Sequence, residues 1–198
     1  MVRASDAAEA RERLVGAVVG LVAELGFEAV SVRQVATRAG VSAGTVQYYF
    51  PTKQAMLRAA MAEVTARVTT TVRAYHRDLP PEVAVRKTAR KIVPLTEAGT
   101  EEVRVWLAFT ARAAVEEDLA AEHRKTGGLL EAHVADLLAR ASGRTAAGAG
   151  DRANSALLLA TLDGLALGAI TEPRRLSGRR LARLVDSAVD QALASSRG

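Results

Sequence analysis

A short stretch near the N-terminus carries polar side chains suited to reading nucleic-acid bases. Gln47 offers an amide that can pair with adenine N6 and N7, and Thr45 can donate to a phosphate or touch a thymine methyl group. Tyr48 and Tyr49 add flat apolar rings that end in a hydroxyl, suited to packing on sugars and reaching phosphate oxygens. These residue types indicate hydrogen bonding to a duplex rather than catalysis.

Capping signals around this stretch predict two short helices joined by a tight turn. Ser31 stands three residues before a glutamine, which is capping-box spacing, so a helix is expected to begin at Val32. Gly40 occupies the place of a left-handed residue that ends a helix. Ser42 can cap a second helix over about 43–50, which buries two apolar residues, Val46 and Phe50.

This arrangement predicts a helix-turn-helix, whose second helix can lie in the DNA major groove. The small residues Ala43 and Gly44 keep the front of that helix thin, so that the backbone can approach the duplex closely.

The charge pattern around the helix pair favours a polyanionic partner. No acidic residue occurs between Glu28 and Glu63, and a polyanion would therefore meet no local repulsion. The segment carries four basic residues: Arg33, Arg38, Lys53 and Arg58. The alternative is a surface helix pair whose tyrosines lie half-buried at the edge of a core.

The run GFEAVSVRQVATRAGVSAGTVQYYFPTKQAML, residues 26–57, resembles the N-terminal domain of TetR-type transcriptional repressors. The resemblance covers the Gly-aromatic pair, the Ala-Gly-Val-Ser turn, the aromatic pair with Phe, and the lysine that follows. Gln47 departs from the pattern, in which a Leu-Tyr dipeptide is common there. The residues expected to contact DNA are Ser31, Arg33, Ser42, Ala43, Gly44, Thr45, Gln47, Tyr48, Tyr49 and Lys53.

Length and composition favour a soluble helical protein. The 198 residues suffice for one or two domains, and hydrophobic residues make up 49% of them, with only 4% aromatic. The formal net charge of +5 favours an anionic partner. The chain has no cysteine, which excludes disulfides and thiolate metal sites and suits a reducing cytoplasm. Without a signal sequence or a membrane span, a cytoplasmic protein is expected.

Apolar periodicity predicts about nine helices and no strand. A first helix ends at Gly26, and a long helix capped by Thr52 runs to about Asp78, where Leu79 and two prolines end it. Further helices are expected from Glu82 towards Pro94 and over 101–117, 118–141 and 152–171, with a last one after Ser177. Gly127–Gly128 weakens the middle of the 118–141 helix, either as a break or as a tolerated defect.

The predicted fold is therefore all-α, with a three-helix DNA-binding head over residues 1–51 and a larger helical domain over 52–198. Arg86, Lys87, Arg90 and Lys91 form a basic run that suggests either a second nucleic-acid contact or a solvated helix face. Gly164 and Gly168 share a helix face that could pack within the chain or against a second copy. The TetR resemblance implies the second reading, a homodimer through the last two helices.

Polar and aromatic residues at inward positions of the larger domain suggest a ligand cavity. The candidates are Trp106, Phe109, Thr110, His133, Thr161 and Asp163. Core packing is the alternative for the two aromatics. Asp163 is more telling, because a buried carboxylate needs a partner: an arginine, a backbone amide or a cationic ligand would each serve.

No catalytic motif is present. The three histidines lack metal-ligand spacing, and there is no nucleophile elbow, phosphate loop or dinucleotide fingerprint, so neither an enzyme nor a metal or cofactor site is expected.

The resemblance implies a homodimeric repressor that binds a palindromic double-stranded DNA operator. A small-molecule effector would tilt the long helix that begins after Thr52 and so change the spacing of the two heads. The rival hypothesis is a helical scaffold or partner-binding protein without operator specificity.

Overall fold

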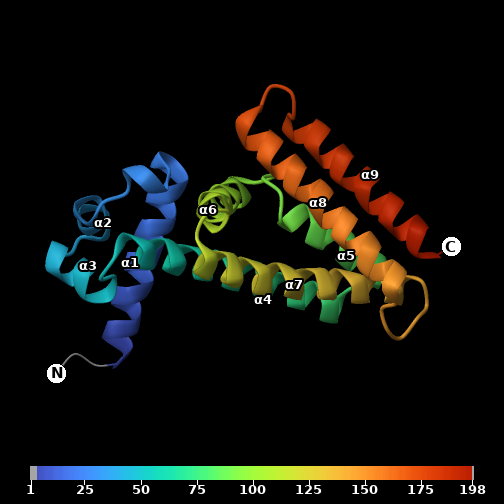
Figure 1. Ribbon diagram of the computed structural model, residues 1–198, viewed down its shortest axis with the longest axis horizontal. Helices are drawn as coiled ribbons and strands as arrows, with labels where there is room; N and C mark the ends of the chain where they lie inside the picture. The colour runs from blue at the N-terminus through green and yellow to red at the C-terminus, as the bar shows by residue number, and fades with distance from the viewer. Residues whose placement is uncertain (1–3, 198) are drawn as a thin grey trace.

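The computed structural model describes residues 4–197, which fold into nine α-helices and one short 3-10 helix, η1 (Phe27–Ala29), and contain no strand. The α-helices are α1 (Ala4–Leu25), α2 (Val32–Ala39), α3 (Ala43–Tyr49), α4 (Lys53–Asp78), α5 (Pro81–Lys91), α6 (Glu97–Ala113), α7 (Glu117–Ala141), α8 (Ala149–Thr171) and α9 (Gly178–Arg197). Helices α1 to α3 form a head at one end of the molecule, and α5 to α9 form the body (Figure 1). The all-α fold predicted from the sequence is confirmed.

The head is built by the local signals that its sequence carries. The Ser31 hydroxyl accepts a hydrogen bond from the Gln34 backbone N–H at 3.4 Å, and Gly40 ends α2 in the left-handed region with φ of 67°. The Ser42 hydroxyl accepts from the Thr45 N–H at 3.1 Å, which starts α3. The predicted caps of both short helices are therefore confirmed.

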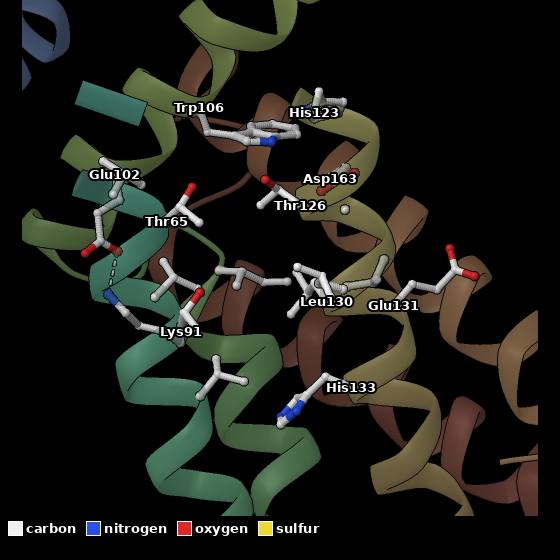
Figure 2. Close-up of a pocket in the computed structure, with 18 of the residues that line it drawn as sticks. Thr65, Lys91, Glu102, Trp106, His123, Thr126, Leu130, Glu131, His133 and Asp163 are labelled. Carbon is white, nitrogen blue, oxygen red and sulfur yellow. Dashed lines mark hydrogen bonds and ion pairs between the residues drawn. The ribbon is translucent and has the colours of Figure 1, made fainter. Parts of the chain in front are cut away.

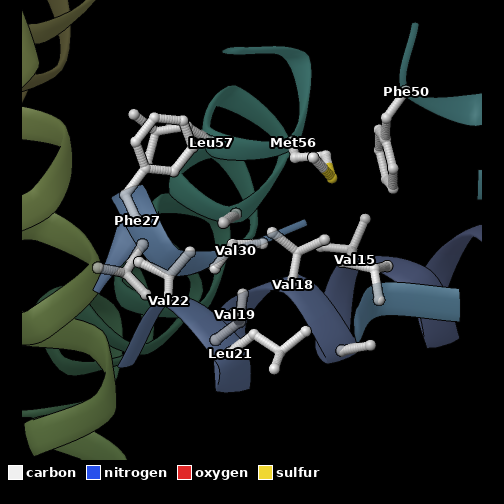
Figure 3. Packing of buried hydrophobic residues seen from close by; sticks show 14 of the residues in the cluster. Val15, Val18, Val19, Leu21, Val22, Phe27, Val30, Phe50, Met56 and Leu57 are labelled. Atoms are coloured by element: carbon white, nitrogen blue, oxygen red, sulfur yellow. The ribbon is translucent and has the colours of Figure 1, made fainter. Parts of the chain in front are cut away.

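Apolar side chains of α1 lie at the centre of the head. Val15, Val18, Val22 and their neighbours pack beneath Phe27 and Phe50 (Figure 3). Of the residues 43–50, only Val46 and Phe50 are fully buried. Because the apolar residues of α3 pack into this core, its polar residues remain on the outside.

Helix α4 connects the head to the body. Thr52 caps it by accepting from the Ala55 N–H at 3.0 Å, and it runs through 26 residues to Asp78, as predicted. Met56, Leu57 and Val64 lie in the head core, whereas Tyr75 at the other end packs against the body core. One rigid helix of about 40 Å thus spans both parts of the molecule.

The head core extends beyond helices α1 to α3. It also includes Val105 and Phe109 of α6 and Leu119 of α7, and α1 packs directly on α6. The body core is a separate cluster formed by α5 to α9, with Leu137, Leu162 and Val185 among its buried residues. Helices α6 and α7 therefore contribute to both cores.

Several helix bounds differ from those predicted. Helix α6 begins at Glu97 because Thr96 caps it, accepting from the Gly99 N–H at 3.0 Å. Helix α7 continues without a break through Gly127–Gly128. Helix α5 ends at Lys91, before Pro94 is reached.

The basic run on α5 faces α9 of the same chain. Arg86 and Arg90 donate to Asp186, with Arg90 Nη2 at 2.5 Å from Asp186 Oδ2, and Arg86 also pairs with Asp190 at 2.6 Å. Lys91 pairs with Glu102 of α6. These arginines hold α5 against α9, and the alternative of a second nucleic-acid contact finds no support in this arrangement.

Candidate nucleic-acid interface and ligand cavity

The outer face of α3 presents the side chains that could read a duplex. Ala43, Gly44, Gln47 and Tyr48 are exposed, and Tyr48 keeps 83% of its surface accessible. Thr45 is half-buried, and its hydroxyl lies 2.9 Å from that of Ser42.

The two adjacent tyrosines have different roles in the free protein. The Tyr49 hydroxyl donates to the backbone carbonyl of Ala7 at 3.3 Å, and its ring packs against the head core. Tyr48 meets Tyr49 edge to face, with ring centroids 5.2 Å apart, and points outward. Tyr49 therefore positions Tyr48, which leaves Tyr48 as the tyrosine available to a partner.

Most of the cations near α3 are already paired within the chain. Arg38 pairs with Glu24 at 2.6 Å, and the Lys53 ammonium donates to the Glu28 carbonyl at 2.5 Å. Arg58 pairs with Asp118 and Glu122 of α7. The segment between Glu28 and Glu63 contains no acidic residue, but most of its cations thus form ion pairs with acidic side chains from other parts of the chain. Arg33 is exposed on α2, and no ion pair to it occurs among the described residues.

The two capping serines also flank this face. Ser31 and Ser42 are exposed at the N-termini of α2 and α3, where unpaired backbone N–H groups favour phosphate oxygens. Together with Arg33, Gln47 and Tyr48, they form a surface that combines base-edge and phosphate donors. We call this surface the reading face.

A cavity of about 540 Å³ lies in the body between α4, α6, α7 and α8 (Figure 2). Its lining is mostly apolar, with Val68, Val72, Val103, Leu130 and Leu159 around the middle. Trp106 and His123 lie at one end and His133 at the other (Figure 2). This size and character are typical of a site for a small organic ligand.

Half of the predicted ligand residues line this cavity. Trp106, His133 and Asp163 do so. Phe109 is buried in the head core, Thr110 lies outside the lining, and Thr161 is exposed on α8, where its hydroxyl donates to the Leu157 carbonyl. Phe109 packs in the head core even though its spacing of three residues from Trp106 places both on one broad face of α6.

Sequence reasoning missed several lining residues on α7. These are His123, Thr126 and Leu130, which together with the predicted His133 follow one another at steps of three and four and so share one helix face. That spacing was a usable signal. Thr65 of α4 and the Lys91–Glu102 pair also line the cavity, and the two partners of the pair neutralise one another.

No ion pair or hydrogen bond to the Asp163 carboxylate occurs among residues 4–197, and the same is true of the side chains of Arg73 and Glu131, which also line the cavity. The surrounding protein desolvates the carboxylate and raises its pKa, which His123 offsets only in part. The residue is nevertheless exposed, so the prediction of a buried carboxylate at Asp163 is wrong. An ionised carboxylate in these surroundings favours a cationic partner.

His133 is held neutral at the other end of the cavity. Burial lowers its pKa, and so does the neighbouring His76, whose ring centroid lies 4.7 Å away, while Asp136 acts in the opposite direction. The Nε2 atom of His133 is buried without a hydrogen-bond partner in the protein. The lowered pKa favours the neutral imidazole, and its Nε2 atom is covered by the surrounding protein.

The outer face of α8 exposes a row of small and apolar residues. Leu157 keeps 69% of its surface accessible and Leu167 keeps 48%, and Leu184 of the neighbouring helix α9 keeps 37%. Gly164 on this face has open space where a Cβ atom would lie. By contrast, a Cβ atom on Gly168 would meet Leu176 at 2.7 Å, so Gly168 serves packing within the chain.

Helix α8 is also long and apolar enough for a membrane span by composition, with a mean hydropathy of 1.5 over its best window. A core helix of a soluble protein meets the same criterion, and α8 packs against both α7 and α9. No group of three or more His, Cys, Asp or Glu side chains suited to a metal ion occurs within residues 4–197.

Comparison with known protein families gives two matches that together cover most of the chain. Residues 15–60 match the family described as bacterial regulatory proteins, tetR family. Residues 81–194 match the family described as BetI-type transcriptional repressor, C-terminal.

Individual proteins support the same relationship. The transcriptional regulator PksA of Bacillus subtilis (strain 168) is 31% identical over 187 residues, which cover 91% of this chain and 88% of PksA. The regulator BetI of Escherichia coli O127:H6 is 30% identical over about half of each chain.

Solved structures extend the comparison. A transcriptional regulator from Rhodococcus sp. Rha1 superimposes with a TM-score of 0.83 at 33% identity, covering 95% of this chain and 98% of that one. A regulator from Saccharomonospora viridis, solved in complex with choline, has the same TM-score at 19% identity and covers 92% of this chain and 96% of that one, a likeness in fold alone.

Proposed function

The chain belongs to the TetR family and is a DNA-binding transcriptional regulator, and from this premise we propose that it represses transcription as a homodimer released by a small-molecule effector. The observation that carries the proposal is the reading face, where Gln47 and Tyr48 are exposed on a helix whose other side is buried in the head. The partner is a palindromic double-stranded operator in the cytoplasm.

In the proposed complex, α3 lies in the major groove. Gln47 pairs with a base edge, Tyr48 packs on sugar and phosphate, and Arg33 of α2 meets the neighbouring phosphates. Ser31 and Ser42 direct backbone N–H groups at the same strand. The thin front formed by Ala43 and Gly44 admits the helix deeply enough for Gln47 to reach the bases.

The proposed dimer forms through the outer face of α8 together with α9. Leu157, Gly164, Leu167 and Leu184 would be covered by the same residues of a second copy, as a two-fold interface requires. The exposed apolar area on α8 is otherwise costly for a soluble protein. Dimerisation sets the two heads at a fixed spacing, so that both can occupy half-sites about one helical turn of DNA apart.

The proposed effector is a small organic cation bound in the cavity. Asp163 provides an unpaired carboxylate, and Trp106 lies toward the same end of the cavity, where an aromatic ring can attract a cation (Figure 2). Choline, bound by the regulator from Saccharomonospora viridis, is the first compound to test. Binding that favours a different tilt of α4 would mismatch the spacing of the heads.

The experiment begins with selection of operator fragments from a random DNA pool by the purified protein. We expect a palindromic sequence, bound with an affinity that exceeds random DNA by at least about 10³-fold at physiological salt. Fluorescence anisotropy then measures the affinity of the protein for the selected fragment, first in the presence of competitor DNA and then at increasing salt concentration. Enrichment of no sequence, or equal affinity for random DNA, would contradict the proposal and favour a scaffold without operator specificity.

A further inference from the structure

Helix α7, like α6, contributes to both the head core and the body core. Near its start, Leu119 is buried in the head core, and Asp118 and Glu122 are ion-paired with Arg58 of α4. Near its end, Val134, Leu137 and Leu138 are buried in the body core. The first part of α7 is thus fastened to the head side of the molecule, and the second part to the body.

The stretch between these anchors is unpacked. None of residues 120–133 is fully buried, and Leu129 keeps 67% of its surface accessible. Several half-buried side chains in this stretch, among them His123, Thr126 and Leu130, line the cavity. Here α7 is a cavity wall that is supported on one side only.

Gly127 and Gly128 lie in the middle of this unsupported wall. A Cβ atom built on either glycine would meet no atom within 4 Å, so packing does not require glycine at either position. Glycine is among the residues least favourable to a helix interior, because it loses the most backbone freedom on folding. Two adjacent glycines therefore weaken α7 where no tertiary contact compensates.

We infer that Gly127–Gly128 form a hinge at which the first half of α7 turns with the head relative to the second half of α7 and the body. The cavity spans this hinge, since His123 and Thr126 lie before it and Leu130 and His133 lie after it. A ligand that contacts both halves favours one hinge angle. The Arg58 ion pairs and Leu119 carry that angle to the start of α4 and to the head core.

This inference rests on the proposed effector cavity for its regulatory meaning, but the hinge itself can be tested without effector or operator. The chain has no cysteine, so introduced cysteines can carry spin labels at unique places. Lys125→Cys with Arg152→Cys spans the hinge, and both positions are exposed. Lys125→Cys with Ala62→Cys is the control pair, because both positions lie on the head side of it.

Pulsed electron resonance gives the distance distribution for each pair, with labelled protein diluted in unlabelled protein so that each dimer carries one labelled chain. We expect the distribution across the hinge to be at least about twice as wide as that of the control pair. Gly127→Ala with Gly128→Ala should narrow it to the control width. Gly16→Ala, a matched change in α1 at another open position inside a helix, should leave it wide.

Amide hydrogen exchange provides a second measurement on the same variants. The two alanines should slow exchange over residues 124–131 by about 20-fold, and Gly16→Ala should not change it. A spin-label distribution across the hinge that is no wider than the control, or one that the two alanines leave unchanged, would overturn the inference. Failure of operator binding would instead contradict the proposed function and leave these distances untouched.

Discussion

The ring of Phe109, buried in the head core, lies 6.4 Å from the ring of His123, which lines the cavity. A single layer of side chains therefore separates the ligand site from the packing that supports the DNA-binding helices. Trp106, one turn before Phe109 on α6, contributes to the cavity itself. A ligand that moves α6 or the first half of α7 will thus act on the head directly, in addition to any effect through α4.

Removal of the reading-face side chains should weaken operator binding without weakening the fold. We expect Gln47→Ala to cost about 1–3 kcal/mol of operator affinity and to relax the preference at one base pair, because the amide contact is lost. Tyr48→Ala should reduce affinity for all sequences, because sugar and phosphate contacts carry no sequence information. Fluorescence anisotropy with the selected operator and its point variants measures both.

Tyr49→Phe is the matched control for Tyr48→Ala. The change removes the hydroxyl that donates to Ala7 and keeps the ring in the head core. Tyr49→Phe should therefore alter thermal stability only slightly. It should also reduce operator affinity much less than Tyr48→Ala does. Specific binding that survives Gln47→Ala and Tyr48→Ala together would refute the assignment of α3 as the recognition helix.

A negative charge introduced on the outer face of α8 should separate the dimer. Leu157→Asp places a carboxylate in the centre of the proposed two-fold interface, opposite its own copy. We expect a monomer in sedimentation analysis and a steep loss of affinity for the full palindrome, with binding to a single half-site less affected. Val115→Asp, at an equally exposed apolar residue in the turn between α6 and α7, should remain dimeric. A dimeric Leu157→Asp protein would place the interface elsewhere.

Local signals in the sequence predicted the head well, because they act within a few residues of the chain. A hydroxyl at Ser31, Ser42 or Thr52 satisfies a backbone N–H three residues further on, whatever the rest of the fold does. Gly40 ends α2 for the same kind of reason, since its left-handed backbone favours glycine. These four features are independent of tertiary contacts and can therefore be predicted from the sequence.

Long-range pairing could not be predicted in the same way. The segment around α3 has no acid in sequence, yet Arg38 finds Glu24 on α1, and Arg58 finds Asp118 sixty residues away. Trp106 and Phe109 both read as inward positions of α6, but the helix lies between two cores and only one of the two residues faces the cavity. Periodicity shows that a residue is buried without showing what it is buried against.

The ion pair between buried Asp151 and exposed Arg144, at the start of α8, should make stability depend on pH. Arg144 donates to both oxygens of Asp151 at 2.6 and 2.7 Å and to the Ser196 carbonyl at 2.7 Å, and Asp151 also accepts from the Gly148 N–H. The hydrogen bond from Arg144 is the main cause of the lowered pKa of Asp151. The contribution of this ion pair to the free energy of unfolding is therefore present above the pKa that Asp151 has in the unfolded state. That contribution is lost as pH falls through the lower pKa of the folded state.

Asp151→Asn should accordingly lower the free energy of unfolding at pH 7 by about 2 kcal/mol, since a charged hydrogen-bond partner is removed from a buried site. Denaturant titrations at a series of pH values measure the difference, which should shrink in acid, where the native carboxylate is protonated too. Glu172→Gln, at an exposed pair with Arg175, should have little effect at any pH. Equal losses of unfolding free energy in Asp151→Asn and Glu172→Gln would mean that the burial of Asp151 contributes nothing to stability.

An organic cation should bind the cavity with an affinity that rises with pH through the pKa of Asp163. Desolvation raises that pKa above its ordinary value, and a cation favours the ionised carboxylate, so binding releases a proton in this range. Affinity should be weak below the pKa, rise as the carboxyl ionises, and level off above it. Trp106 is the only tryptophan in the chain and lines the cavity, so its fluorescence reports binding during titration with choline.

Asp163→Asn should lower choline affinity by about 10-fold or more at neutral pH and remove the pH dependence, because a charge-assisted contact is lost. The variant should fold at least as stably as the native chain, since a desolvated carboxylate opposes folding at neutral pH. Glu131→Gln is the matched control, because this cavity-wall carboxylate points away from the interior (Figure 2). A pH dependence that persists in Asp163→Asn, or disappears in Glu131→Gln, would assign cation recognition to another group.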